Sequence, residues 1–446
     1  MNESAPLVES ENFSSQVSQI QTWTQKTDQP VMVEGLSGSS RAYFLSKFIK
    51  AHKRPVVIFT TDQNSGERLQ DDLKYFLRYE KLKHQPDFFP AWELLPYEPL
   101  SPLNEISGER LDILNRLRTG EPMLLVVPLE AGLQTVMPRS VIEKLIFTVA
   151  IKMNLEREFL EACLSDNGFT RSPLVENRGE FSVRGDIVDF FQPGRVNPVR
   201  IEFFGDEVES IREFDVLSQV SISELDTVNL LPVRELCLNE IEKQQGVVAI
   251  KDFAEKNDCD RLALKELLEK IEHLGIFSGM EYLAPFFYAD RESLFDYLPA
   301  DTLIVLDEGD QLQNKSEQFQ QLIDTEYHSA LEKGEVVAPP SALFLEMQEF
   351  KKRLSSFNGN LSLNALKMTG YELGRCQNLD VKPVPALAGK FDDFSHQVLK
   401  WQEQDNKVVI VAPTKGQVRR IHELLHEWGL EVDVDLGRIS EGFKLK

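Results

Sequence analysis

The residues closest to a catalytic pattern lie in a glycine-rich stretch that follows a short apolar segment. A phosphate-binding loop reads GxxxxGK[ST]: its glycines let backbone amides wrap the phosphates, its lysine adds charge and its hydroxyl binds magnesium. Gly35 and Gly38 suit such a loop, but Ser40 replaces the second required glycine, Arg41 the lysine and Ala42 the hydroxyl. Three of the four key features are therefore altered, and arginine is not a conservative replacement for a packed lysine.

A second part of a nucleotide site would be an apolar strand that ends in carboxylates, and residues 303–310 (LIVLDEGD) have this form. Asp307 and Glu308 occupy the positions of a magnesium ligand and a base. The alternative is a buried strand that ends in a solvated acidic turn, and the altered loop favours it. We expect a degenerate nucleotide site, whose residues still lie together but no longer act on a nucleotide. It consists of Gly35, Gly38, Arg41, Asp307 and Glu308.

A different pattern, HExxH, is formed by His422 and His426, and its spacing places two imidazoles on one helical face, as in zinc enzymes. The helix that carries them lies between two expected strands, and no third ligand in a zinc-enzyme context follows. We therefore interpret it as a surface helix without zinc. No Ser, His and Asp arrangement and no paired carboxylates stand out, so no catalytic residue and no metal ligand is predicted.

The most informative stretch is residues 178–215, whose alternation predicts a three-stranded antiparallel meander. The first strand is expected to sort its side chains by face, with Phe181, Val183 and Ile187 inward and Ser182 and Arg184 outward. The strand after the turn is expected to do the same, with Val199, Ile201 and Phe203 inward and Arg200, Glu202 and Phe204 outward. Gly205-Asp206 then suits a tight hairpin turn.

An outward phenylalanine among arginines is the composition of a protein-binding hot spot. This face therefore predicts a protein partner. The alternative is that Phe204 is covered by a neighbouring element of the same chain, and the periodicity alone leaves both open.

The bulk composition is that of a globular protein, with 42% hydrophobic and 27% charged residues. A length of 446 residues indicates two to four domains, and a net charge of -23 argues against tight nucleic-acid binding by this chain alone. The four cysteines form no CxxC pair, so a reducing compartment is expected. Neither a signal peptide nor a run of 18 apolar residues is present, which favours a cytoplasmic protein with no membrane partner.

The order of expected elements predicts a multidomain α/β fold, because strands and helices alternate as in a parallel sheet. An α+β domain with antiparallel character interrupts this alternation. The predicted division is residues 1–145 (first α/β domain), 146–231 (inserted domain), 232–345 (completion of the first domain) and 346–446 (a small α/β domain that includes a strand at 361–364). Because the chain stops at GFKLK, just after a turn-like segment, we expect a fragment of a longer protein.

Four stretches carry a resemblance to a known family: AWELLPYEPLSP (91–102), GEFSVRGDIVDFFQPG (179–194), NPVRIEFFGDEVESIREFD (197–215) and FSGMEYLAPFFY (277–288). With them the chain resembles the N-terminal, UvrB-homologous module of the bacterial transcription-repair coupling factors (the Mfd family). The resemblance implies helicase-like α/β lobes without a motor, an inserted domain that binds UvrA, and a further small domain. It also agrees with the altered loop, since UvrB keeps a working phosphate loop and the coupling factor does not.

The resemblance further implies which residues contact UvrA. The arginine of the VRG motif is Arg184, the arginine of the next strand is Arg200, and the second of the paired phenylalanines is Phe204. Arg171 and Arg178 lie nearby in the sequence and are added as candidates, with Arg195 in the turn a weaker one. The first three are also the residues that the strand alternation places outward.

The function implied is recruitment of nucleotide excision repair to stalled RNA polymerase, without catalysis or a cofactor in this chain. RNA polymerase, double-stranded DNA, ATP and magnesium would be bound by other domains of a DNA-translocating ATP hydrolase, one of which would mask the UvrA surface. One alternative is an ATP-dependent DNA-remodelling enzyme that uses Arg41, Asp307 and Glu308. Another, compatible with UvrA docking, is a scaffold that holds the motor inactive.

Overall fold

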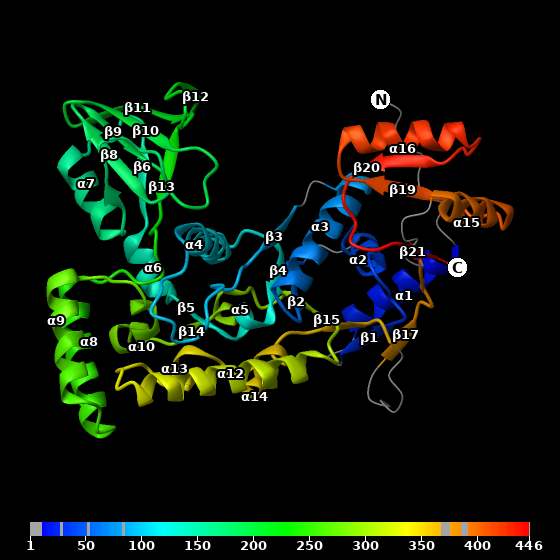
Figure 1. Ribbon diagram of the computed structural model, residues 1–446. Helices are drawn as coiled ribbons and strands as arrows, with labels where there is room; N and C mark the ends of the chain where they lie inside the picture. Colours follow the sequence, from blue (N-terminus) through cyan, green and yellow to red (C-terminus); the bar gives the residue numbers. More distant parts are fainter. Residues whose placement is uncertain are drawn as a thin grey trace.

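The computed structural model describes residues 11–26, 30–50, 54–82, 85–366, 375–384 and 391–445 (Figure 1). The first ten residues, part of the polar leader, lie outside these ranges. Within the described ranges, every helix is too short or too polar to cross a lipid bilayer.

A seven-stranded sheet forms the centre of the larger part of the chain, and every pair of neighbouring strands in it is parallel. Its order is β17 (Arg375–Asn378), β1 (Val31–Glu34), β16 (Leu361–Asn364), β15 (Leu303–Asp307), β2 (Val56–Thr60), β4 (Leu124–Pro128) and β3 (Pro86–Phe88). The predicted α/β class with a parallel sheet is confirmed.

Helices cover both faces of this sheet, as its continuous apolar strands require. In β2, Val56 and Ile58 face one core, and Val57 and Phe59 face the other. The first core is closed by α1 (Glu11–Lys26), α2 (Ser40–Lys50) and α3 (Gln63–Tyr79). The second is closed by α4 (Asn104–Arg118), α5 (Leu129–Leu133), α6 (Arg139–Leu145), α11 (Leu294–Tyr297) and α14 (Met347–Leu354).

One strand lies elsewhere than expected. Residues 361–364 were predicted to belong to the small last domain, but β16 lies inside the main sheet, between β1 and β15. A parallel sheet accepts strands from distant parts of the chain, because each crossover runs over its face. Sequence order therefore does not indicate which sheet a late strand enters.

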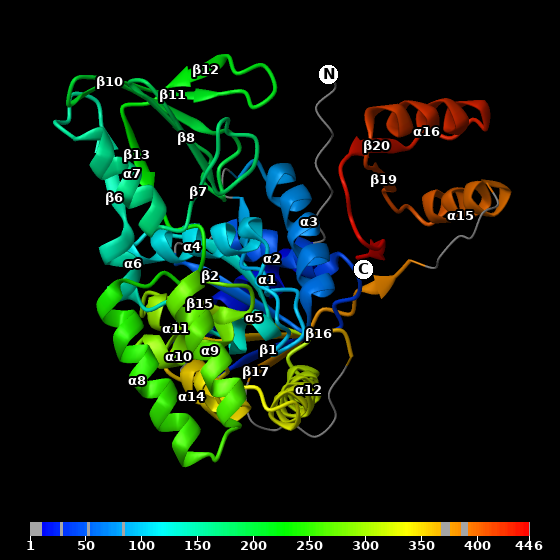
Figure 2. The ribbon, with the colours of Figure 1, turned by 60° about the vertical axis from the view of Figure 1, so that its left-hand side comes forward.

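The interrupting segment forms a six-stranded sheet that is antiparallel except between its first two strands. The strands are β7 (Thr170–Arg171), β8 (Glu180–Arg184), β9 (Ile187–Phe190), β10 (Val199–Phe204), β11 (Glu207–Phe214) and β12 (Ser221–Glu224). Its inner face packs on α7 (Arg157–Asp166) and on the paired strands β6 (Phe147–Ala150) and β13 (Thr227–Leu230). Figure 2 shows this sheet standing above the main body.

The predicted three-stranded meander contains one strand more than expected. Gly185 and Asp186 form a two-residue turn that splits the first predicted strand into β8 and β9, and Gly185 adopts a φ of +61°. Ile187 consequently pairs with Arg184 and shares its outer face, so the prediction that Ile187 points inward is wrong. The turn at Gly205-Asp206 is where it was predicted.

The remaining elements surround these two sheets. Two helices, α8 (Glu240–Lys256) and α9 (Arg261–Leu274), form a hairpin beside the main body, and a small unit holds β19 (Val409–Ala412), β20 (Asp433–Leu436), α15 (Phe391–Glu403) and α16 (Lys415–Glu427). This unit and the six-stranded sheet lie on opposite sides of the molecule in both views. A long helix, α12 (Leu312–Glu332), also packs against the main body. The shorter elements are β5 (Thr135–Val136), η1 (Met280–Leu283), α10 (Ala284–Phe287), β14 (Glu292–Ser293), α13 (Pro340–Leu343), β18 (Lys382–Pro383) and β21 (Phe443–Lys444).

Candidate functional site

The outer face of the six-stranded sheet carries rows of side chains that cross its strands. Ser182 lies opposite Asp189, Asp189 opposite Arg200, and Arg200 opposite Arg212. Residues that pair directly across strands share one face of the sheet. The outer face therefore holds both arginines of the predicted site, with a carboxylate between their strands.

Asp189 holds these two arginines together. Its carboxylate accepts hydrogen bonds from Arg184 (Nη2 to Oδ2, 2.6 Å) and from Arg200 (Nε to Oδ1, 2.8 Å; Nη2 to Oδ2, 2.9 Å). Asp189 itself is completely buried. A buried carboxylate is stable only when it is paired and hydrogen-bonded. The buried Asp189 carboxylate therefore holds both guanidinium groups in place.

Arg200 is much less available to solvent than the alternation suggested. Its guanidinium lies over the ring of Phe214, 4.5 Å from the centroid, and donates to Gln219, so that only 14% of its side chain is exposed. The hydrogen bonds with Asp189 raise the pKa of Arg200 above its ordinary value. Arg184, with 46% of its side chain exposed, is the more accessible of the two. The expectation of two guanidinium groups standing open to water therefore fits Arg184 and does not fit Arg200.

Phe204 is 79% exposed at the end of β10, so no element of the described chain covers it. It lies on the outer face, four residues beyond Arg200 and therefore about 13 Å further along the strand. Glu202 stands between them and accepts hydrogen bonds from Ser210 and Arg212. The face thus presents a free aromatic ring next to charged groups that are already paired within the sheet.

The three weaker candidates divide between the two faces. Arg171 pairs with Phe181 of the inner face and forms an ion pair with Glu161 of α7, so it lies away from Arg184. Arg178 stacks over Phe191, 4.7 Å from the centroid, and donates to the carbonyl of Arg195. Arg195 in turn pairs with Glu213 at 2.7 Å.

Two members of the outer face were missed or misjudged from the sequence. Asp189 was not selected, although an aspartate inside the apolar run IVDFF is an unusual core residue that needs a partner. Ser182, predicted to face solvent, is buried, and its hydroxyl donates to the carbonyl of Pro173.

The degenerate nucleotide site is assembled as the sequence order suggested, but its basic residue is already occupied. Arg41 donates from Nη1 to Asp307 (3.1 Å) and to Glu308 (2.8 Å). Burial raises the pKa of Asp307 to about 6, against the opposing charge of Arg41. Arg41, the cation that would contact a phosphate, is thus neutralised by Asp307 and Glu308. These are the carboxylates that would bind magnesium and activate water in a working site.

The glycine loop of this site is also covered by the chain itself. A Cβ added to Gly38 would lie 2.8 Å from Cβ of Glu441, and the Glu441 amide donates to the Ser39 hydroxyl at 3.0 Å. Ser440 donates from its amide and its hydroxyl to Asp72 (2.6 and 2.7 Å), and burial raises the pKa of that carboxyl. A Cβ added to Gly35 would likewise lie 2.6 Å from Oδ1 of Asn378 and 3.0 Å from the amide nitrogen of Asp380.

The HExxH residues lie on α16, where His422 and His426 are both exposed. Among the described residues, no group of three or more His, Cys, Asp or Glu side chains is arranged to hold a metal ion. The four cysteines are free thiols, at positions 163, 237, 259 and 376.

Comparison with known proteins relates this geometry to a family. The model of the UvrB interaction domain matches residues 147–236, which contain the six-stranded sheet. The transcription-repair-coupling factor of Myxococcus xanthus is 30% identical over 94% of this chain and 36% of its own length. The corresponding proteins of Bacillus subtilis (27% identity, 90% of this chain, 34% of the relative) and Escherichia coli (29%, 72% and 27%) are also similar.

The chain spans about a third of the length of these relatives. The resemblance seen in the sequence motifs is confirmed by matches that extend far beyond those motifs. The chain is homologous, over nearly its whole length, to the transcription-repair coupling factors, and it contains a UvrB interaction domain.

Proposed function

We propose that this chain is the UvrA-docking module of a transcription-repair coupling factor. By binding UvrA it would bring nucleotide excision repair to RNA polymerase that has stalled at DNA damage. The observation that carries the proposal is the exposure of both the Phe204 ring and the Arg184 guanidinium on the outer face of one sheet, which lies within a UvrB interaction domain. Residues 146–231 are the proposed docking domain.

The three main residues have different roles in this proposal. Phe204 fills an apolar pocket of UvrA and is the central anchor, since aromatic side chains dominate the binding energy of such interfaces. Arg184 pairs with an acidic group of UvrA through donors that Asp189 leaves free, because a guanidinium has five N–H groups. Arg200 contributes the flat edge of its stacked guanidinium, and Arg178 extends the surface.

The direct test is a calorimetric titration of this chain with UvrA from the same organism. Saturable binding that requires Phe204 supports the proposal. The proposal is contradicted if the folded chain shows no binding and its unfolding temperature is the same with and without UvrA.

We further propose that this chain has no catalytic activity. The support is the closed state of the degenerate nucleotide site, in which Arg41 is paired with Asp307 and Glu308 and residues 440–442 lie on the loop. The competing proposal is an ATP-dependent DNA-remodelling enzyme. A titration with a fluorescent ATP analogue and magnesium decides between them, because saturable micromolar binding would favour the enzyme.

The other partners belong to the longer protein in this proposal. RNA polymerase, double-stranded DNA, ATP and magnesium would be bound by regions that the relatives have beyond the matched third, and the protein would act in the cytoplasm. A scaffold role that restrains a motor would add to UvrA docking. Its test is whether deletion of residues 1–345 accelerates ATP hydrolysis by the intact protein.

A further inference from the structure

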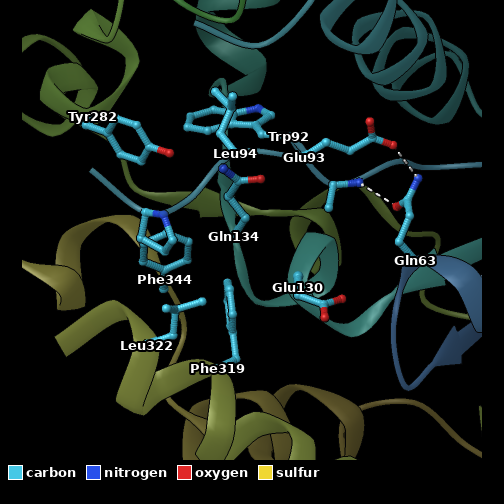
Figure 3. Close-up of a pocket in the computed structure, with 12 residues that line it drawn as sticks. Gln63, Trp92, Glu93, Leu94, Glu130, Gln134, Tyr282, Phe319, Leu322 and Phe344 are labelled. Carbon is cyan, nitrogen blue, oxygen red and sulfur yellow. Dashed lines mark hydrogen bonds between the residues drawn. The ribbon is translucent and has the colours of Figure 1, made fainter. Parts of the chain in front are cut away.

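A cavity of about 260 Å³ lies in the parallel α/β part of the molecule, among residues 91–96, α5 and α12 (Figure 3). Its apolar walls are aromatic and aliphatic: Trp92, Tyr282, Phe319, Leu322 and Phe344. This volume is below the range typical of nucleotide or drug sites and is enough for one long side chain. None of the lining residues belongs to the six-stranded sheet, so the cavity is independent of the proposed UvrA surface.

Two polar side chains of the lining come from α5 and the residue after it. Gln134 is only 5% exposed, and its side-chain amide points into the cavity in Figure 3. Glu130 has a buried carboxylate oxygen, Oε2, that has no hydrogen-bond partner among the described residues. Buried polar atoms are nearly always paired, because leaving one unsatisfied is costly. The unpaired oxygen of Glu130 therefore points to a ligand that supplies a hydrogen-bond donor.

The charge of the lining is one-sided. Glu93 and Glu130 both line the cavity, and Gln63 donates to the Glu93 carboxylate at 3.1 Å. No lysine or arginine is among the described residues that line the cavity. A cation is therefore the complementary ligand. The aromatic walls favour the same choice, since a guanidinium stacks on aromatic faces while it donates hydrogen bonds from its edge.

We propose that this cavity binds the side chain of an arginine from a segment of a partner protein. Its guanidinium would donate to Oε2 of Glu130 and to the side-chain carbonyl of Gln134, and it would stack against the aromatic walls. A purely apolar side chain would leave Oε2 of Glu130 unpaired. A nucleotide could place its base against the amide and the rings, but its phosphates would meet two carboxylates and a chain of net charge -23.

The test uses the whole 446-residue chain and N-acetyl-arginine amide as the probe, with binding measured by saturation-transfer NMR. We expect saturable binding, and roughly tenfold weaker binding in Glu130→Gln and in Gln134→Leu. N-acetyl-citrulline amide, which has the same shape without the charge, should bind at least tenfold more weakly. Glu143→Gln, at an exposed position, is the matched control and should bind as the parent does.

Both variants should fold, because neither replacement removes a hydrogen bond to another residue of the described chain, and the Glu130 carboxylate bonds only to its own backbone. The proposal is overturned by absence of saturable binding, by equal binding of the citrulline probe, or by unchanged binding in both variants. Preferential binding of adenosine would also overturn it, because the cavity would then be a nucleobase site.

Discussion

Asp189 and Arg200 face each other on neighbouring strands and are joined by two hydrogen bonds of 2.8 and 2.9 Å. Asp189 is completely buried, so Arg200 has a structural task in addition to any role in binding. A loss of UvrA binding in an Arg200 variant would therefore mix two effects. Arg184, which also donates to Asp189 but is far more exposed, separates them.

Arg200→Ala should lower the free energy of unfolding by roughly 3 kcal/mol, because it leaves the buried Asp189 carboxylate with one partner fewer. Thermal and urea unfolding measure the loss. The double variant Asp189→Asn, Arg200→Gln should recover a good part of it, since neither group is then charged. Equal stability of parent and Arg200→Ala would show that Asp189 does not depend on Arg200.

Arg184→Gln should weaken UvrA binding about tenfold, a change of about 1.4 kcal/mol. The amide of glutamine can still donate to Asp189, so the unfolding temperature should stay close to that of the parent. Arg171→Gln is the matched control, because Arg171 lies in the same sheet on the opposite face. If both variants lose affinity equally, the effect is one of net charge and the outer face is not the contact.

Phe204→Ala should reduce UvrA affinity by at least about 2 kcal/mol, which is a hot-spot effect of roughly 30-fold. Stability should change little, because the ring is 79% exposed and loses few contacts. Leu217→Ala removes a side chain that is even more exposed, at 94%, in the turn after β11. Calorimetry should find that variant normal, and a comparable loss there would place the anchor elsewhere.

The stability of the degenerate nucleotide site should depend on pH through Asp307. Burial raises the pKa of this carboxyl to about 6, whereas an unfolded aspartate titrates near 3.9. The folded state binds the extra proton between these values, so the contribution of Asp307 to stability is full below about pH 4 and is lost as the pH rises through 6. Asp307→Asn should therefore gain stability relative to the parent between pH 4 and pH 7.5, by about 3 kcal/mol.

Thermal unfolding of parent and variant across this range measures that gain. Asp301→Asn, at an exposed position just before the same strand, is the control and should show no such trend. A constant difference between Asp307→Asn and the parent at every pH would contradict the assignment.

The sequence predicted the fold best where alternation or apolar runs extend over a whole strand. The six residues of β10 alternate from Val199 to Phe204, and each faces the side predicted for it. The prediction failed at Gly185-Asp186, because a two-residue turn inside an apparently continuous pattern reverses the chain and moves Ile187 to the other face. The pairing of Asp189 with Arg200 depends on the register between β9 and β10, which the sequence alone does not give.

The nucleotide loop shows a second limit of the sequence. Gly35, Gly38 and Arg41 indicate an altered phosphate site, but residues 440–442, which cover it, are about 400 positions further along the chain. Nothing local in a Ser-Glu-Gly stretch indicates where it docks. Contacts between such distant segments depend on the whole tertiary arrangement and not on local pattern.

The arrangement of Arg184 and Arg200 around one carboxylate also affects how much free energy a partner would lose in ordering this surface. Long side chains that become immobile at an interface cost roughly 0.5–1.5 kcal/mol each in rotamer freedom. Here the sheet has restricted these side chains before any encounter, and the cost falls on folding. A partner that binds this face would therefore meet side chains whose rotamers are already restricted, and less of the binding free energy would be needed to order them.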